Sequence, residues 1–376
     1  MHKGSNLRDL NVYIIGAGII GLYLAQRLEA LGIHTVMYEG KSIASERAER
    51  ASGILSKSGL ERIGLTNLQS AEINKLNGAI LYAHNERMRI VSKQTQAYVL
   101  DRKILAQIMF DRARDAGVEI YLGSRKNADA LREMAAEKNS ILIGADGAVS
   151  SVASAFNFPA IQKHVLTYKA EYSADKIEDV GLVGLYFSGN FAHGLFGWHV
   201  PYSNNKIEMG LGIDMHSGIS SSVAFERFLE TNFSGFELKN KLSGHASLIP
   251  IAPRKKTVLG NVALVGDCAG QVKATTGGGI VFGALCAGTL AETIERVALG
   301  KGELKGYEQL WRKRYGTDLY MHTMIHRLYT KIDNRGLGFV FRAMKAIGME
   351  EFFGKYGDMD RPSVMLKRFF LRGAVK

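Results

Sequence analysis

The spacing of apolar residues changes twice along the first 40 residues. Residues 12–15 form a short β-branched run that ends at a glycine. Ile20, Leu24 and Leu28 then recur at helical spacing, and residues 35–38 form a second short apolar run. The pattern predicts a strand, a helix and a second strand, and so a βαβ unit of about 30 residues at the start of a nucleotide-binding fold.

The pattern then leaves this unit and returns to it. Residues 40–75 are polar and of helix-forming types, and this composition predicts helix. Apolar runs at 79–82, 89–91 and 97–100 predict strands of a separate sheet, whereas helical spacing at 101–116, then strands at 118–122 and 140–143, predict a return to the first unit.

A second strand-rich stretch follows, and the chain ends in helices. Strands are predicted at 184–188, 194–200 and 207–213, one helix at 221–231, a buried strand at 262–267 and a helix of small residues at 277–297. Helical spacing continues from residue 301 to the end. The apolar segment Ile332–Phe353 has three basic residues within it and predicts either a membrane-facing helix or tunnel wall, or a helix packed on the core.

Composition places the chain among globular proteins. It has 376 residues, 46% of them hydrophobic, and five prolines, which excludes disorder and a collagen-like repeat. Two cysteines, Cys268 and Cys286, are too few for a disulfide framework, so we expect inert packing roles and a cytoplasmic location. No signal peptide is visible at the N-terminus, and no run of 18 apolar residues predicts a membrane-spanning helix. No metal site is predicted.

The net charge of +12 narrows the partners to anionic ones: phosphates, acidic lipid headgroups or nucleic acid. Residues 301–376 hold sixteen Lys and Arg against eight Asp and Glu, so most of the excess lies there. No nucleic-acid-binding module accompanies this charge, and aromatic residues are not interleaved with it as a stacking platform. We therefore expect no nucleic acid and favour an anionic membrane surface.

A glycine-rich turn joins the first strand to the first helix. In Gly16-Ala17-Gly18-Ile19-Ile20-Gly21, the first glycine makes the tight turn, the second admits a pyrophosphate and the third allows close packing. The helix N-terminus attracts the anion, and Glu39 after the second strand accepts hydrogen bonds from ribose hydroxyls. The arrangement predicts a site for an adenine dinucleotide, the alternative being a glycine turn in an unrelated α/β fold.

Further motifs favour FAD over NAD. Val265-Gly266-Asp267-Cys268-Ala269-Gly270 resembles the second FAD fingerprint of glutathione-reductase-like and hydroxylase-like flavoproteins, in which the aspartate contacts the ribitol or pyrophosphate. Asp101-Arg102 resembles the arginine-bearing motif of that group, and Gly144-Ala145-Asp146-Gly147 its GADG motif. For Asp146, direct contact with the cofactor and stabilisation of a turn by its carboxylate are equally supported.

One family resembles the chain over nearly its whole length. Residues 266–280, Gly-Asp-Cys-Ala-Gly-Gln-Val-Lys-Ala-Thr-Thr-Gly-Gly-Gly-Ile, resemble the geranylgeranyl reductase family, whose members saturate prenyl double bonds, notably in archaeal membrane lipids. Phe-Gly-Trp-His-Val-Pro at 196–201 and Asp-Met-Asp-Arg-Pro-Ser at 358–363 resemble two further patterns of that family.

This resemblance implies a fold and an organisation. We expect a mixed α/β protein with a Rossmann-like FAD-binding domain, an inserted antiparallel-sheet substrate domain and a helical C-terminal region. The predicted FAD-binding domain is discontinuous (1–78, 100–156 and 250–300), the substrate domain comprises 79–99 and 157–249, and the C-terminal region is 301–376.

It also implies the site. The residues expected to bind FAD are Gly16, Gly18, Gly21, Glu39, Arg50, Ala51, Arg102, Asp267, Gly278, Gly279 and Ile280. Two positions depart from the family: Ala51 stands where relatives often have cysteine, and Tyr202 follows Pro201 where a lysine is common. We therefore expect no cysteine-dependent step at Ala51 and no phosphate contact at Tyr202.

The expected reaction is hydride transfer from N5 of the reduced flavin to a C=C bond of a geranylgeranyl or other prenyl chain. Phe196, Trp198, His199 and Pro201 are expected to line an apolar channel, with His199 as a weak candidate proton donor. The alternatives are that Trp198 is core and that His199 satisfies a local hydrogen bond. Two roles are open for Lys273, Thr275 and Thr276 beside the glycine run: contact with flavin or a substrate headgroup, or a structural role.

The partners that follow are a prenyl lipid and an electron donor that is a ferredoxin, a reduced deazaflavin or NAD(P)H. The expected location is the inner face of the membrane, as a peripheral protein. An aromatic or quinone monooxygenase of the same fold is the alternative function. A flavin halogenase is less favoured, because Phe196 occupies the first position of the Trp-x-Trp-x-x-Pro pattern.

Overall fold

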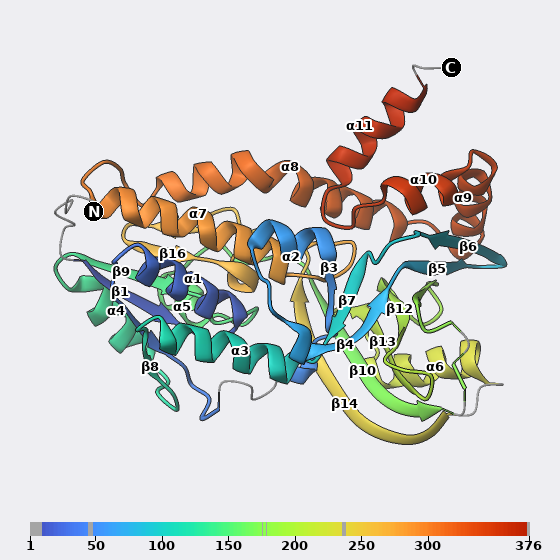
Figure 1. Ribbon diagram of the computed structural model, residues 1–376, viewed down its shortest axis with the longest axis horizontal. Helices are drawn as coiled ribbons and strands as arrows, with labels where there is room; N and C mark the ends of the chain where they lie inside the picture. Colours follow the sequence, from blue (N-terminus) through green and yellow to red (C-terminus); the bar gives the residue numbers. More distant parts are fainter. Residues whose placement is uncertain (1–9, 44–47, 175, 178, 235–237, 374–376) are drawn as a thin grey trace.

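The mixed α/β fold expected from the sequence is confirmed. The computed structural model describes residues 10–43, 48–174, 176–177, 179–234 and 238–373. Within these ranges the chain forms three sheets and eleven α-helices (Figure 1).

A six-stranded sheet holds the N-terminal βαβ unit. Its order is β15-β16-β9-β1-β2-β8, parallel throughout except for the antiparallel pair β15 and β16. The strands are β1 (Asn11–Ile15), β2 (Thr35–Tyr38), β8 (Glu119–Tyr121), β9 (Ser140–Gly144), β15 (Val258–Leu259) and β16 (Val262–Leu264). Because β1, β2, β9 and β16 are parallel, the loops that follow them meet at one edge of the sheet.

Helices cover both faces of this sheet. On one face α1 (Ile19–Ala30), α3 (Arg102–Asp115) and α7 (Ile280–Ala298) bury a continuous apolar core. On the other face, α4 (Ala128–Ala136) and α5 (Ser151–Ala155) pack on β9 through Leu131 and Val152. The glycine turn and the second fingerprint thus start from a rigid, two-sided layer.

A seven-stranded sheet forms the second layer of the molecule, with the order β14-β10-β13-β12-β11-β5-β6. Its strands are β5 (Gly78–Ala83), β6 (Glu86–Val91), β10 (His164–Ala174), β11 (Leu182–Phe187), β12 (Gly194–Pro201), β13 (Lys206–Asp214) and β14 (Leu238–Pro250). All neighbours are antiparallel except β5 and β11. Helix α6 (Ser221–Phe233) covers one face through Phe225 and Phe228.

A three-stranded sheet corrects two sequence expectations. It consists of β3 (Ile54–Ser56), β7 (Ala97–Leu100) and β4 (Glu72–Leu76), next to the short helix α2 (Lys57–Ile63). The prediction of helix throughout 40–75 is wrong at β3 and β4, because strands this short have no periodicity that stands out from their polar neighbours. The run at 97–100 was expected in the same sheet as 79–82 and 89–91, but it pairs with β3 and β4 instead.

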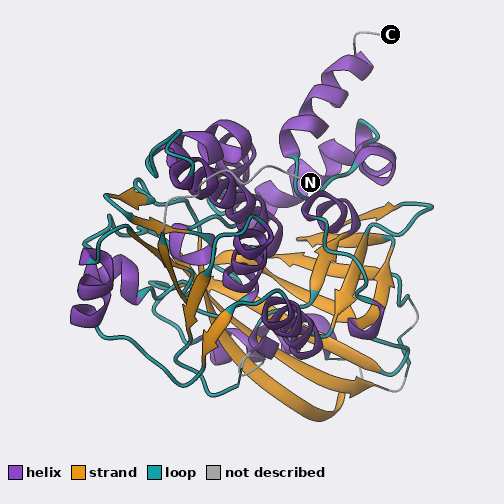
Figure 2. Ribbon diagram, turned by 60° about the vertical axis from the view of Figure 1, so that its left-hand side comes forward, coloured by secondary structure: helices purple, strands orange, loops and turns teal. Residues whose placement is uncertain are grey.

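Four helices complete the chain: α8 (Gly306–Tyr329), α9 (Asn334–Ala346), α10 (Met349–Tyr356) and α11 (Pro362–Gly373). The single helix expected over Ile332–Phe353 is broken at Gly348, whose φ of 72° lies in the left-handed region. Helices α9 and α10 pack on β5 and β6, and α11 projects from the body of the molecule (Figure 2). The predicted domain boundaries stay a prediction.

The segment 332–353 packs on the core through one face of α9, as one of its two alternatives predicted, and a membrane-facing or tunnel-wall role for its outer side stays a prediction. Leu337 and Phe341 are buried against Ala83 and Met88 of the sheet. Phe339 and Ile347 on the outer side are 70% and 61% exposed. In the part of the chain that the structure describes, no helix has the length and apolar character needed to cross a bilayer.

Candidate functional site

The glycine turn after β1 has the geometry that the fingerprint requires. Gly16 has a φ of 108°, which other residues rarely adopt, and Gly21 lies so close to the Gly16 carbonyl that a Cβ there would collide with it. Gly18, the N-cap of α1, has open space where a Cβ would be. The turn therefore packs tightly at two glycines and leaves an open cradle at the third, beside the N-terminus of α1.

Glu39 is fastened to this turn. Its carboxylate accepts hydrogen bonds from the backbone N–H groups of Ala17, at 2.9 Å, and Lys41, at 3.0 Å. The side chain is buried. Glu39 thus lies where β2 ends, within reach of a ribose bound over the glycine turn, as the βαβ arrangement predicts.

Asp267 and Arg102 form the second part of the site. Asp267 lies in the short 3₁₀ helix Gly266–Ala269 that follows β16, and Arg102 begins α3. Burial raises the pKa of the Asp267 carboxyl, an effect that the Arg102 guanidinium opposes. Burial lowers the pKa of Arg102 to about 10, so it stays protonated at neutral pH.

Arg102 carries a buried atom that calls for a ligand. Its Nε is shielded from solvent and has no hydrogen-bond partner in the protein. A buried unpaired donor of this kind costs about 1–3 kcal/mol unless something accepts from it. Together with the open cradle at Gly18, this unpaired donor fits the phosphates or ribityl hydroxyls of FAD.

The start of α7 lies against Asp267. A Cβ at Gly279 would approach Asp267 Oδ1 to 2.6 Å, and one at Gly278 would lie 3.0 Å from Lys273 Cε. Gly277 has a φ of 73°, and Ile280 is the first helical residue. The backbone N–H groups of this N-terminus are suited to the anionic edge of a reduced flavin.

Two substitutions separate binding from packing at the glycine turn. We expect Gly18→Ala to weaken FAD binding with little change in the melting temperature of the FAD-free protein, because its Cβ enters open space. Gly21→Ala is expected to lower that melting temperature, because its Cβ meets the Gly16 carbonyl. FAD titration and thermal unfolding of the FAD-free variants measure both effects; equal behaviour of the two variants would contradict the assignment.

Asp146 of the GADG motif has a structural role in the described contacts. Its carboxylate accepts from the hydroxyls of Ser150 and Ser151 and from the backbone N–H groups of Ser151 and Val152, at the start of α5. Cys268 donates to the carbonyls of Gly144 and Val265, and burial raises the pKa of its thiol. Neither residue has the geometry of a catalytic group.

The segment Arg50–Gly53 lies against the seven-stranded sheet. Ser247 Oγ of β14 donates to the Arg50 carbonyl at 3.0 Å, and the Ser52 hydroxyl donates to Glu208. Ala51 is exposed. Ala51, the position at which relatives often have cysteine, is thus held beside the seven-stranded sheet by its neighbours in sequence. Contact of Arg50 and Ala51 with FAD stays a prediction.

Sequence reasoning missed a buried charged cluster on this sheet. Glu208 of β13 is fully buried and accepts from Lys169 Nζ at 2.7 Å, Tyr202 OH at 2.8 Å and Trp198 Nε1 at 3.0 Å, besides Ser52. Burial alone would raise the pKa of Glu208, but Lys169 and the other donors outweigh it and lower the pKa. The only signal in the sequence was a charged residue at a core position of an apolar strand.

The four expected lining residues do not share one face of β12. Phe196 and Trp198 point toward Phe187 and Glu208, away from α6. His199 points the other way, where its Nδ1 bonds to Tyr186 OH at 2.9 Å and its ring contacts Phe233 of α6. Adjacent strand residues project to opposite faces, so His199 and Trp198 cannot line the same channel.

His199 is also a poor proton donor. Burial lowers its pKa to about 4, so the imidazole is neutral at neutral pH. Its described contacts are those of a histidine that satisfies a local hydrogen bond. Pro201 ends the strand, and its carbonyl accepts from Asn74 Nδ2 at 2.9 Å.

The loop before α7 is tied to the C-terminal region. Lys273 Nζ lies 2.6 Å from Asp360 Oδ1, and Asp360 also accepts from the Ser56 hydroxyl that caps α2. Thr275 Oγ1 lies 2.7 Å from His322 Nδ1 of α8. The contacts of Lys273 are therefore those of a structural residue. Its partner, Asp360, belongs to the family pattern at 358–363.

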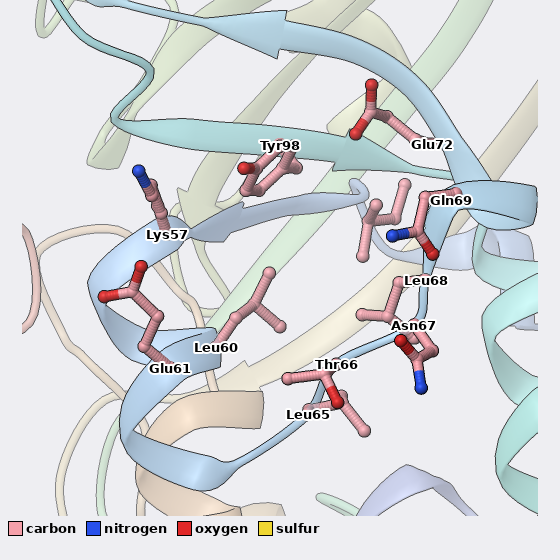
Figure 3. Close-up of a pocket in the computed structure, with 11 residues that line it drawn as sticks. Lys57, Leu60, Glu61, Leu65, Thr66, Asn67, Leu68, Gln69, Glu72 and Tyr98 are labelled. Atoms are coloured by element: carbon pink, nitrogen blue, oxygen red, sulfur yellow. The ribbon is translucent and has the colours of Figure 1, made fainter.

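One open pocket lies apart from these residues. It has a volume of about 220 Å³ and is lined by α2, the loop that follows it and the strands β4 and β7 (Figure 3). Lys57, Glu61 and Glu72 stand at its rim, and Leu60 and Leu68 form its floor. None of the residues predicted from the sequence to bind cofactor or substrate lines it.

Comparisons with known proteins identify what the chain is similar to. Residues 9–176 match the family model of the FAD binding domain. The digeranylgeranylglycerophospholipid reductase of Methanocaldococcus jannaschii is 27% identical over 359 residues, with 87% of this chain and 88% of the relative covered. The chain is an FAD-dependent oxidoreductase similar to the geranylgeranyl reductases.

Two further relatives extend the similarity. The uncharacterized protein MJ1520 of Methanocaldococcus jannaschii is 26% identical, with 95% of this chain and 93% of the relative covered. The crystal structure of a geranylgeranyl bacteriochlorophyll reductase-like protein from Thermoplasma acidophilum superposes with a TM-score of 0.77 at 17% identity, covering 94% of this chain and 98% of the other. The expected cofactor, FAD, and the expected family resemblance are confirmed for this oxidoreductase.

Proposed function

We propose that this protein saturates C=C bonds of a geranylgeranyl or related prenyl chain, carried by a precursor of membrane lipids. The observation that carries the proposal is the similarity to digeranylgeranylglycerophospholipid reductases over about nine-tenths of both chains. The cradle at Gly18, the unpaired Arg102 Nε and Asp267 agree with it, because the reaction depends on a bound flavin.

The chemistry supplied by bound, reduced FAD is hydride transfer. Gly18 and the N-terminus of α1 would bind its pyrophosphate, at a turn that Gly16 and Gly21 shape. Glu39 would bind its adenosine ribose, and Arg102 and Asp267 would hold its central part. The face of the seven-stranded sheet that carries Phe196 and Trp198 excludes water from the prenyl chain. Because water is excluded, polar interactions at this face are stronger than they are in solvent.

Lipid mass spectrometry tests this function. Cells that make geranylgeranyl lipids are given this protein, and lysates are supplied in turn with reduced ferredoxin, reduced deazaflavin or NAD(P)H. We expect gains of two mass units per double bond with at least one of these donors, and no gain with the Asp267→Ala variant. Unchanged lipids with a flavin-loaded protein and every donor would contradict the proposal.

We also propose an anionic membrane surface as the partner that presents this lipid. Leu328, Phe339, Ile347, Phe370 and Leu371 are each at least 60% exposed, and all lie in the basic C-terminal region. Exposed apolar residues among Lys and Arg are typical of helices that lie in a bilayer interface.

Vesicle sedimentation tests this partner. We expect Phe370→Ser/Leu371→Ser and Lys367→Gln/Arg368→Gln each to reduce binding to vesicles that contain phosphatidylglycerol, since α11 projects from the body. Lys138→Gln, a basic residue outside this region, is the control. Equal binding of all variants at low salt would exclude α11 as the contact.

The alternative, a monooxygenase of the same fold, is less favoured, because relatives with reductase names match almost the whole chain. Oxygen incorporation with substrate-stimulated NAD(P)H oxidation would reverse this preference.

A further inference from the structure

The inner face of α8 carries three buried polar atoms without partners. They are His322 Nε2, His326 Nδ1 and Tyr329 OH. Their spacing of four and three residues places them in one row along the helix. His322 is 3% exposed and His326 is fully buried. We call these three residues the α8 polar row.

The other ring nitrogen of each histidine is bonded. His326 Nε2 donates to the Gly194 carbonyl at 2.6 Å, and a carbonyl only accepts, so the proton is on Nε2 and Nδ1 presents a lone pair. His322 Nδ1 is bonded to the Thr275 hydroxyl. Its Nε2 is therefore either a free donor or a free lone pair, according to which of the two groups donates.

Both imidazoles are neutral at neutral pH. Burial lowers the pKa of each to about 4. The charged groups that face His322 are Lys273, Asp318 and Asp360. The backbone carbonyl of Asp360 also acts on the imidazole and opposes the lowering of its pKa. The charged groups that face His326 are Lys163, Asp214 and Arg327. A neutral row does not attract an anion, so a lipid phosphate is not its ligand.

The row joins two parts of the proposed site. At one end, Thr275 is two residues before Gly277, where the start of α7 and Asp267 meet. Ala274 packs in the same apolar cluster as Leu195 and Phe196 of β12. At the other end, the Tyr329 ring contacts Phe187, which in turn contacts Phe196 and Phe341. Tyr329 itself is partly exposed.

Three unpaired polar atoms in one apolar layer require a ligand. Leaving one such atom unpaired costs about 1–3 kcal/mol, and buried polar groups in proteins almost always have a partner. Because the row is neutral, offers both donors and acceptors and is surrounded by aromatic side chains, water is the partner that fits all three atoms.

We propose that the α8 polar row holds a chain of internal water molecules and delivers protons to the site beside Gly277–Gly279. The delivery part rests on the proposed function. Saturating one double bond forms two C–H bonds: the hydride carries the electron pair and one hydrogen nucleus, and the second carbon takes a proton. That proton leaves a water held at His322 Nε2 and is replaced from solvent through the Tyr329 end. An external reductant restores the two electrons.

The water chain is tested without substrate. A crystal structure of the FAD-loaded protein, refined to high resolution, is expected to contain ordered water at hydrogen-bond distance from His322 Nε2, His326 Nδ1 and Tyr329 OH. The Tyr329→Phe variant, which removes only the hydroxyl, is expected to lose the water next to it. A dry row, or side chains that pair with all three atoms, would overturn the proposal.

Proton delivery is tested in single turnovers of the reduced enzyme with a prenyl lipid, in H₂O and D₂O. His322→Leu is expected to slow flavin reoxidation by about 100-fold, the lower range for loss of an acid–base group. Tyr329→Phe is expected to slow it less and to increase the solvent isotope effect. Tyr320→Phe on the outer face of α8, where Tyr320 is 62% exposed, is the control and is expected to match the wild type.

The outcomes separate the two proposals. FAD occupancy and the rate of flavin reduction are expected to be unchanged in all three variants. Wild-type rates and isotope effects in Tyr329→Phe and His322→Leu would overturn proton delivery by the row. If the wild type turns over no prenyl lipid, the proposed function fails and proton delivery fails with it, whereas the water positions are decided by the crystal structure alone.

Discussion

Replacement of Asp267 by alanine is expected to deprive the protein of most of its FAD. The half-buried carboxylate faces the positive charge of Arg102 and lies next to Gly279 at the start of α7, and the substitution leaves the guanidinium without its counter-charge. A hydrogen bond to a charged group contributes about 1.5–3 kcal/mol, so affinity for FAD is expected to fall about 10- to 100-fold. The flavin absorbance per protein after gel filtration measures the loss.

Two controls accompany this variant. Asp267→Asn keeps the size of the side chain and is expected to retain more FAD than Asp267→Ala. Asp129→Ala on α4, where the carboxylate is exposed, is expected to retain all of it. Full occupancy in Asp267→Ala would show that the second fingerprint does not hold the flavin here.

The largest loss of stability is expected on breaking the ion pair between Lys273 and Asp360. Asp360 is fully buried and Lys273 is 5% exposed, so Lys273→Met leaves a carboxylate in the core without its partner. Removing one partner of such a pair costs about 3–5 kcal/mol, whereas replacing both by apolar residues is often neutral. We therefore expect a much lower free energy of unfolding for Lys273→Met than for Lys273→Met/Asp360→Leu, measured in urea.

The same pair predicts a pH dependence. Burial would raise the pKa of Asp360, but Lys273 and the Ser56 hydroxyl outweigh it and hold the pKa below the ordinary value of 3.8. A carboxyl with a lowered pKa in the folded state stabilises the fold above its unfolded pKa and loses this contribution as the pH falls through the folded pKa. The wild type is therefore expected to lose more stability than the double variant as the pH falls below about 4. Parallel pH profiles would contradict this assignment.

Local motifs explain why the glycine turn and the acidic residues near it could be predicted from the sequence. A glycine that must adopt a positive φ or accept a close backbone contact has no substitute, so Gly16 and Gly21 mark the turn directly. The strand before it and the helix after it are predicted by their apolar spacing, and a parallel sheet brings Glu39 and Asp267 to the same edge. The mixed α/β fold and FAD followed from these short stretches.

The substrate side was much less accessible. Strands β3 and β4 have three and five residues and owe their existence to pairing with β7, far along the chain. The face on which a β12 side chain lies depends on strand register and on which element covers each side of the sheet. Periodicity places Phe196, Trp198 and His199 on one strand. It does not show which face of the sheet α6 covers, and so which of these side chains lie on the opposite face.

The sequence by itself determined the nucleotide-binding half, because its signals are glycines, acids and apolar runs that act within about 30 residues of one another. The tertiary structure decided which buried polar groups are neighbours: Glu208 with Lys169, Lys273 with Asp360, and the α8 polar row with Thr275. Lys273 and Asp360 are 87 residues apart. Such contacts leave no local pattern, since each partner is chosen by packing across the whole fold rather than by the residues beside it.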